Sequence, residues 1–186
     1  KMVGNGILKL VERALPEHLR THDYVMAARE VFLAYYIDHI DRYTRPYNGI
    51  REVLHTLQDE GWSLAVASNK FDSGTKHLVT SIFPEVQFKA IYGNREEFPL
   101  KPDAALVELI MKECEAEREM TTMIGDSGVD MQTAKNGGVR SIGCTWGFRS
   151  RTELEENGAD YRVDSPLEIL QILNILRLFG LNRGYM

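Results

Sequence analysis

The strongest constraint on the fold is a regular alternation of helix and strand patterns from residue 50 onward. Short, almost wholly apolar segments such as "SLAVAS" (63–68) and "TTMIG" (121–125) alternate with amphipathic segments of helical period. Strands that are apolar on both faces are typical of a parallel sheet covered by helices on both sides. We therefore expect an α/β fold. Its strands are expected at 63–68, 88–93, 121–125, 139–146 and 161–163, and its helices at 50–60, 73–82, 103–117, 131–136, 151–157 and 166–179.

The N-terminal part of the chain has a different pattern. Residues 7–43 are helical in period throughout and contain no strand pattern. Pro46 disfavours helix at the residue before it, and Asn48-Gly49 favours a turn. We therefore expect a helical lobe at 1–45 and an α/β core at 46–186. The aromatics of the lobe recur at helical spacing and are expected to pack inside it: Phe32, Tyr35, Tyr36 and Tyr43.

Composition excludes several classes of function. The 186 residues carry a mild net charge of -5 and no dense Lys/Arg run, so nucleic acid is not an expected partner. Cys114 and Cys144 are too few for a disulfide framework and are expected to be small buried hydrophobes. No apolar run approaches the ~20 residues that span a bilayer, and no signal peptide is recognisable. We expect a cytoplasmic protein that is a monomer or a homodimer.

Polar side chains gather where the predicted strands end. Ser68 and Asn69 follow the strand at 63–68, and Asp126 follows the strand at 121–125, with Asp130 four residues later. Lys101 lies in a loop directly before a predicted helix. Ligands bind parallel sheets at the carboxyl ends of the strands. Carboxylates suit Mg²⁺, and a hydroxyl and an ammonium suit a phosphate, so this set predicts phosphoryl transfer.

Each of these residues also has a simpler local explanation. Ser68 and Asn69 could cap the following helix, and Lys101 could be an ordinary loop lysine. Asp126 with Ser127 could form a helix N-cap, and Asp130 could be an exposed helix residue. The gathering of all of them at strand ends is what favours a functional site.

Three stretches resemble motifs of a known family. "LAVASNK", "LKPD" and "MIGDSGVDMQTAKNGGV" are similar to the second, third and fourth motifs of the haloacid dehalogenase superfamily, within its phosphoglycolate phosphatase-like branch. The resemblance implies a Rossmannoid parallel sheet with helices on both faces, and it identifies the helical lobe as a cap domain. It also implies that Ser68 and Asn69 bind the phosphoryl group and that Lys101 holds the phosphate and the nucleophile.

By the same resemblance, Asp126 would ligate Mg²⁺. Asp130 would support the metal directly or through water, and Ser127 would lie in the outer shell of the site. The substrate would be a small phosphorylated metabolite. The implied function is a magnesium-dependent phosphatase that acts on a small phosphomonoester, foremost phosphoglycolate, through an aspartyl phosphate.

The first motif of the family, Asp-x-Asp-Gly-Thr, does not occur in the sequence. It would supply the aspartate nucleophile, and its strand is central in the family's sheet. We expect a leading segment to exist in the natural protein, and we expect the chain as given to be inactive alone. One alternative is a non-catalytic phosphate-binding or interaction module that has lost the motif. Another is a different activity of the superfamily: sugar phosphatase, phosphoglucomutase or pyrophosphatase.

A response-regulator receiver domain is a further alternative, since it also gathers acids, a hydroxyl and a lysine at one sheet edge. In receivers the phospho-accepting Asp precedes the hydroxyl, and the lysine comes last. Here the order is Ser68, Lys101, Asp126. The order therefore disfavours a receiver domain.

Overall fold

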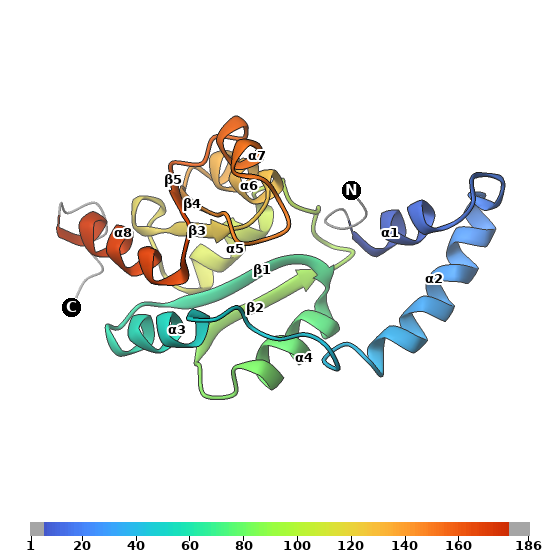
Figure 1. Cartoon of the computed structure of the whole chain (residues 1–186), viewed down its shortest axis with the longest axis horizontal. Coiled ribbons are helices and arrows are strands. Elements are labelled where there is room, and N and C mark those ends of the chain that lie inside the picture. Colours follow the sequence, from blue (N-terminus) through green and yellow to red (C-terminus); the bar gives the residue numbers. More distant parts are fainter. Residues whose placement is uncertain (1–5, 179–186) are drawn as a thin grey trace.

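The computed structural model describes residues 6–178, and its strands form two parallel sheets (Figure 1). One sheet contains β1 (Leu64–Phe71) and β2 (Phe88–Asn94). The other has the order β3-β4-β5, with β3 at Thr122–Gly125, β4 at Arg140–Cys144 and β5 at Tyr161–Val163. All pairings are parallel. The predicted α/β class and all five predicted strands are confirmed. Residues 1–5 of the expected cap and residue 179 of the last expected helix lie outside the described range.

The parallel register places the carboxyl ends of the strands along one edge. Thr122 pairs with Arg140 and Gly125 with Gly143, so β3 and β4 end together. In the other sheet, β1 and β2 run in the same direction, with Ala67 paired with Tyr92. Within the described residues, β1 and β3 are not paired with each other, and each is an edge of its own sheet. Ser68 therefore lies on an edge strand of one sheet, and Asp126 follows an edge strand of the other.

Helices cover both faces of the second sheet. Ile142 on β4 belongs to a buried cluster with residues of α3 (Ile50–Asp59) and α8 (Pro166–Leu178). The next residue, Gly143, faces the other way because side chains alternate along a strand, and a Cβ there would lie 3.2 Å from Leu154 of α7 (Arg151–Glu156). The remaining core helices are α4 (Asp72–Ile82), α5 (Ala105–Glu113) and α6 (Gly128–Gly137), with a short 3₁₀ turn at Arg118–Met120.

The N-terminal helices lie to one side of this core (Figure 1). They are α1 (Gly6–Ala14) and α2 (His22–Ile37), joined through a 3₁₀ turn at Glu17–Leu19. The helical prediction for this part of the chain is confirmed, although α2 ends at Ile37 rather than continuing to residue 43. Gly49, with φ of +87°, makes the expected turn before α3. The domain boundary between residues 45 and 46 remains a prediction.

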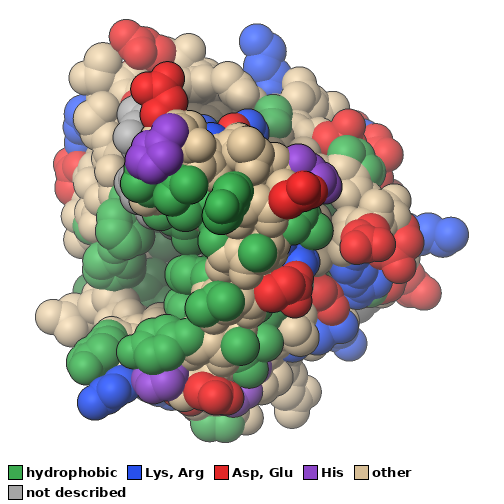
Figure 2. Space-filling view, turned by 90° about the vertical axis from the view of Figure 1, so that its right-hand side faces the viewer, with side chains coloured by type: hydrophobic (Ala, Val, Ile, Leu, Met, Phe, Trp, Pro, Cys, Tyr) green, Lys and Arg blue, Asp and Glu red, His purple; other side chains and the backbone are tan. Residues whose placement is uncertain are grey.

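The aromatic residues of α2 and Tyr43, which follows that helix, do not all pack inside the lobe as predicted. Tyr35 is 65% exposed and Tyr43 is 81% exposed, whereas Phe32 and Tyr36 are half-buried. Tyr35 is exposed because α2 is apolar around most of its circumference, so not every apolar side chain of the helix can face the core, and none of its residues is fully buried. Figure 2 looks onto this side of the molecule and shows hydrophobic side chains gathered around a hollow.

Two predicted boundaries near the site were wrong. The strand β1 continues past residue 68 to Phe71, which pairs with Asn94 after a register shift. The helix α6 begins at Gly128 rather than Met131, because Ser127 caps it. No described helix is both long enough and apolar enough to cross a membrane.

Candidate functional site

Lys101 connects β1 to the helix that follows β3. Its Nζ donates hydrogen bonds to the Ala67 carbonyl of β1 at 2.9 Å and to Asp130 Oδ1 of α6 at 2.6 Å. The side chains of Lys101 and Asp130 are each only 10% exposed. The interpretation of Lys101 as an ordinary loop lysine is therefore wrong, because this ammonium is desolvated and paired.

The Asn69 side chain holds the loop that presents Lys101. Its Nδ2 donates to the Lys101 carbonyl at 3.0 Å, and its Oδ1 accepts from the Lys101 N–H at 2.8 Å. Asn69 was predicted to contact phosphate through its own backbone N–H, and that role remains a prediction. The sequence did not reveal a second role of Asn69: its side-chain amide forms two hydrogen bonds with the backbone of Lys101 and so fixes that backbone in place.

Asp130 is buried, so its interpretation as an exposed helix residue is wrong. It is 7% exposed, and its Oδ2 accepts from Ser127 N–H at 3.1 Å and from Ser127 Oγ at 2.6 Å. Ser127 Oγ in turn lies 3.4 Å from Asp130 N, which completes a capping box at the start of α6. The carboxylate crosses the end of β3, where a Cβ on Gly125 would lie 2.4 Å from Asp130 Cβ. Asp130 thus ties α6 to Lys101.

Asp126 lies half-buried directly after β3, and the loop after β4 holds its carboxylate in place. Its Oδ2 accepts from the Phe148 N–H at 3.0 Å, and a Cβ on Gly147 would lie 2.2 Å from that oxygen. The loop after β4 therefore packs its backbone against this carboxylate, a contact permitted because residue 147 is glycine. No described residue donates a hydrogen bond to Asp126 Oδ1.

Of the two predicted magnesium ligands, Asp126 fits the role better than Asp130. Asp126 Oδ1 accepts no hydrogen bond from residues 6–178, which suits an ion that keeps several waters and shares the remaining positions with a phosphate. Both Asp130 oxygens already accept hydrogen bonds from Lys101 and Ser127. Within residues 6–178, no group of three or more His, Cys, Asp or Glu side chains is arranged to hold a metal. The predicted magnesium ligands Asp126 and Asp130 therefore remain a prediction, and the contacts favour Asp126.

Ser68 lies within β1 with its hydroxyl half-buried. Its Oγ accepts from the Lys70 N–H at 3.1 Å, which leaves its own O–H able to donate to a ligand oxygen. The alternative that Ser68 or Asn69 caps the following helix is wrong. The helix α4 begins at Asp72, and no side-chain hydrogen bond caps it.

The pKa of Cys144, at the end of β4, reflects the negative charge of the site. Burial, together with the nearby carboxylates of Asp126 and Asp130, raises the pKa of its thiol to about 12. A thiolate there is disfavoured because it would add a third negative charge to a poorly hydrated region. The same negative field favours a cation beside Asp126. Cys144 is buried as predicted, whereas Cys114 is only half-buried, and both are free thiols.

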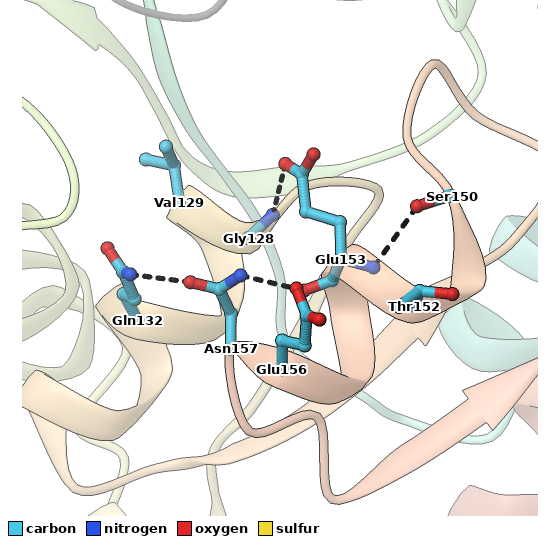
Figure 3. A pocket seen from close by; sticks show the side chains of 8 residues that line it. All are labelled: Gly128, Val129, Gln132, Ser150, Thr152, Glu153, Glu156 and Asn157. Atoms are coloured by element: carbon cyan, nitrogen blue, oxygen red, sulfur yellow. Dashed lines mark hydrogen bonds between the residues drawn. The ribbon is translucent and has the colours of Figure 1, made fainter.

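A hollow lies between α6 and α7 (Figure 3). Glu153 points its Oε1 at the Gly128 N–H at 3.3 Å, so a carboxylate already occupies the N-terminus of α6. Asn157 Nδ2 donates to the Glu153 carbonyl at 2.7 Å. The hollow is lined by none of the predicted site residues, so we do not assign the chemistry to it. Its lining is Gly128, Val129, Gln132, Ser150, Thr152, Glu153, Glu156 and Asn157.

Sequence reasoning missed three contributors to the site. Gly147 and Phe148 contact Asp126 from a loop about 22 residues later in the chain. No local sequence pattern indicates that this loop packs against Asp126. Lys70 is the last residue of the stretch "LAVASNK", but the sequence suggested no role for it. Its ammonium lies against Tyr36 of α2. An aromatic at helical spacing in α2 was the one available signal for that contact.

Comparison with known proteins agrees with the motif resemblance. The family model of haloacid dehalogenase-like hydrolases matches residues 5–144. The phosphoglycolate phosphatase of Aquifex aeolicus is 26% identical over 174 residues, which cover 94% of this chain and 78% of that protein. The phosphoglycolate phosphatase of Mesorhizobium japonicum is 28% identical over 153 residues, covering 81% and 67%.

Solved structures share the fold. A crystal structure of a candidate phosphoglycolate phosphatase from Lactobacillus delbrueckii superposes with a TM-score of 0.84 at 30% identity, and the match covers 92% of this chain and 80% of that one. With the family model and the three motifs in agreement, the chain belongs to the haloacid dehalogenase-like hydrolase family.

Proposed function

We propose that the full-length protein is a magnesium-dependent phosphatase that hydrolyses a small phosphomonoester, with phosphoglycolate as the foremost substrate. The observation that carries this proposal is the meeting of Lys101, Asp130 and the ends of β1 and β3 in one half-buried cluster. The phosphoglycolate phosphatases of Aquifex aeolicus and Mesorhizobium japonicum support the choice of substrate. A cytoplasmic location and a monomeric or dimeric state remain predictions.

The proposed roles follow from the contacts. Lys101 Nζ places a desolvated positive charge at the sheet edge, where it neutralises charge on a transferring phosphoryl group. The Ser68 hydroxyl donates to a phosphoryl oxygen, with the Asn69 N–H beside it. Asp130 and the Ala67 carbonyl fix the position of Lys101, so little reorganisation is needed when phosphate binds.

Asp126 is the residue that would hold magnesium, with Asp130 and Ser127 supporting it from α6. When bound, the metal supplies positive charge against the phosphate oxygens. The Phe148 N–H orients Asp126 for this task, because it donates a hydrogen bond to Oδ2 and so leaves Oδ1 as the oxygen that would bind the metal.

The proposed nucleophile is an aspartate on an N-terminal segment that precedes the given sequence. Two observations support a place for its strand between β1 and β3. These strands are edges of separate sheets, yet Lys101 bridges the end of β1 to the helix that follows β3. Ile124 on β3 is 39% exposed, although strands in such sheets are normally covered. An added parallel strand would pair both edges and cover this side chain.

A substrate panel on the full-length protein tests the proposal. Phosphate release is measured with phosphoglycolate, sugar phosphates, nucleoside monophosphates and pyrophosphate, each with magnesium and with EDTA. We expect magnesium-dependent hydrolysis with the highest kcat/KM for phosphoglycolate. A higher kcat/KM for another ester would move the assignment to a different activity of the family. Phosphate binding without hydrolysis of any ester would favour the non-catalytic module.

A further inference from the structure

Lys70 carries an ammonium beside the site that no acid neutralises among the described residues. The residue is half-buried at the end of β1, and its backbone N–H donates to Ser68 Oγ at 3.1 Å. Its Nζ donates to the Tyr36 hydroxyl and lies 4.6 Å from the centroid of the same ring. No Asp or Glu of residues 6–178 forms an ion pair with it. The positive charge therefore belongs to a residue whose backbone N–H contacts the hydroxyl of the predicted phosphate-binding serine.

Tyr36 is itself fixed in place by other aromatic rings. It stacks on Phe32 of the same helix at a centroid distance of 5.2 Å and meets the edge of Phe71 at 6.2 Å. Phe71 directly follows Lys70 on β1. The contact therefore joins helix α2 to the strand end that carries Ser68, and it sets where the Lys70 ammonium lies.

The other basic side chains near the strand ends are already neutralised. Lys101 pairs with Asp130 at 2.6 Å. Arg151 pairs with Asp164 at 2.6 Å. Lys70 differs from these residues because it has no anionic partner within residues 6–178. A half-buried charge is costly without such a partner. A tyrosine ring and hydroxyl compensate such a charge only partly.

We propose that Lys70 binds a second anionic group of the substrate, a carboxylate one or two carbons from the phosphate ester, and that Tyr36 positions Lys70 for it. This inference rests on the proposed phosphatase function and names its substrate class as phosphorylated hydroxy acids. An N⁺–H···O⁻ bond between the ammonium and a carboxylate is of the strong, charge-assisted kind. Phosphomonoesters of the same size whose organic group is uncharged lack this bond, so the contact selects among substrates that share the phosphate.

The test compares Lys70→Gln with the unchanged full-length protein on two substrates of matched size. These are phosphoglycolate and 2-hydroxyethyl phosphate, in which a hydroxymethyl group replaces the carboxylate. We expect Lys70→Gln to lower kcat/KM for phosphoglycolate about 30-fold, mainly through KM, consistent with loss of one hydrogen bond to a charged group. We expect less than threefold change for 2-hydroxyethyl phosphate. Lys89→Gln is the matched control, because Lys89 is an exposed lysine on the neighbouring strand β2.

Two more variants separate recognition from a merely structural role. Lys70→Arg keeps the charge and is expected to recover most of the preference for phosphoglycolate. Tyr36→Phe keeps the ring and removes the hydroxyl, so it is expected to raise KM for phosphoglycolate several-fold with kcat unchanged. Equal losses on both substrates, or no loss on either, would overturn the inference and leave Lys70 as a link between helix α2 and the core.

Calorimetric titration distinguishes failure of this inference from failure of the proposed function. Both ligands are titrated into the unchanged protein and into Lys70→Gln without measuring hydrolysis. Tighter binding of phosphoglycolate that depends on Lys70, in a protein that hydrolyses neither ester, rejects the phosphatase but supports the carboxylate contact. Hydrolysis of both esters with no dependence on Lys70 in kinetics or binding rejects the contact but supports the phosphatase.

Discussion

Lys101 Nζ lies 2.6 Å from Asp130 Oδ1, and this ion pair connects the loop before α5 to the first turn of α6. The Asp130 carboxylate has two structural tasks, since its other oxygen accepts from Ser127 N–H and Oγ. The residue that was predicted as a metal ligand is therefore also a support for Lys101 and for the start of the helix.

Asp130→Asn is expected to destabilise the protein by about 3 kcal/mol, because it leaves the Lys101 ammonium buried without its anionic partner. Ser127→Ala is the control, since it removes only the cap and is expected to cost about 1 kcal/mol. Urea unfolding followed by circular dichroism measures both variants. Equal losses of stability in the two variants would show that the ion pair contributes nothing beyond the cap.

Gly147→Ala is expected to reduce magnesium-dependent activity at least tenfold while leaving the fold intact. The new Cβ would meet Asp126 Oδ2 at 2.2 Å and Asp126 Cβ at 2.3 Å, so the carboxylate or the loop must move. The measurement is activity against magnesium concentration, with the midpoint expected to rise.

Gly137→Ala serves as the comparison for this variant, because the nearest atom to its Cβ would be at 3.4 Å and the residue ends helix α6. It is expected to retain full activity and normal magnesium dependence. If Gly147→Ala behaves like Gly137→Ala, the backbone contact with Asp126 has no functional role.

Asp72, at the start of α4, is expected to make a pH-dependent contribution to the stability of the protein. Burial opposes the shift, but hydrogen bonds from Lys76, the Gly93 N–H and Arg95 lower the pKa of this carboxyl below its ordinary value of 3.8. A group with a lowered folded pKa stabilises the protein above its unfolded pKa, and the contribution disappears as pH falls through the folded value.

Asp72→Asn is therefore expected to lower stability by about 1 kcal/mol at pH 7, and the difference from the unchanged protein should shrink below pH 3.8. Urea midpoints at pH 7, 5 and 3 provide the measurement. Asp59→Asn, at an exposed aspartate that ends α3, is expected to change little at any of these pH values. A stability loss for Asp72→Asn that is constant with pH would show that its charge is not involved.

The two cysteines are expected to differ in reactivity. Cys144 is 5% exposed with a pKa raised to about 12, so at pH 8 it is both shielded and protonated. Burial also raises the pKa of Cys114, but its thiol is only half-buried. Iodoacetamide should label Cys114 first in the native protein and label both after urea unfolding, as followed by peptide mass spectrometry. Labelling of Cys144 as fast as Cys114 in the native state would contradict the burial of the β4 end.

The sequence was sufficient for the parts of the fold that depend on local pattern. Each strand that ends near the site was predicted within about three residues, because apolar runs bounded by Gly, Asn or Asp mark parallel strands. The convergence of Lys101 and Asp130 was predicted from the rule that carboxyl ends share one sheet edge.

Contacts between distant segments could not be predicted in this way. The Asn69 contact with the Lys101 backbone spans 32 residues, and the Lys70 contact with Tyr36 spans 34. Neither follows from period or composition, because both depend on how a loop and a helix pack against the end of β1. The capping box at Ser127 was available from the sequence, but the apolar Met131 was taken as the start of the helix.

The central claim is that the cluster around Lys101 and Asp126 carries out magnesium-dependent phosphoryl transfer. The most direct measurement is phosphate release from phosphoglycolate by the full-length protein as magnesium is titrated, compared with Asp126→Ala. The account predicts saturable activation by magnesium in the unchanged protein and none in Asp126→Ala, with both proteins folded by circular dichroism. Equal magnesium-dependent activity in the two proteins would contradict it.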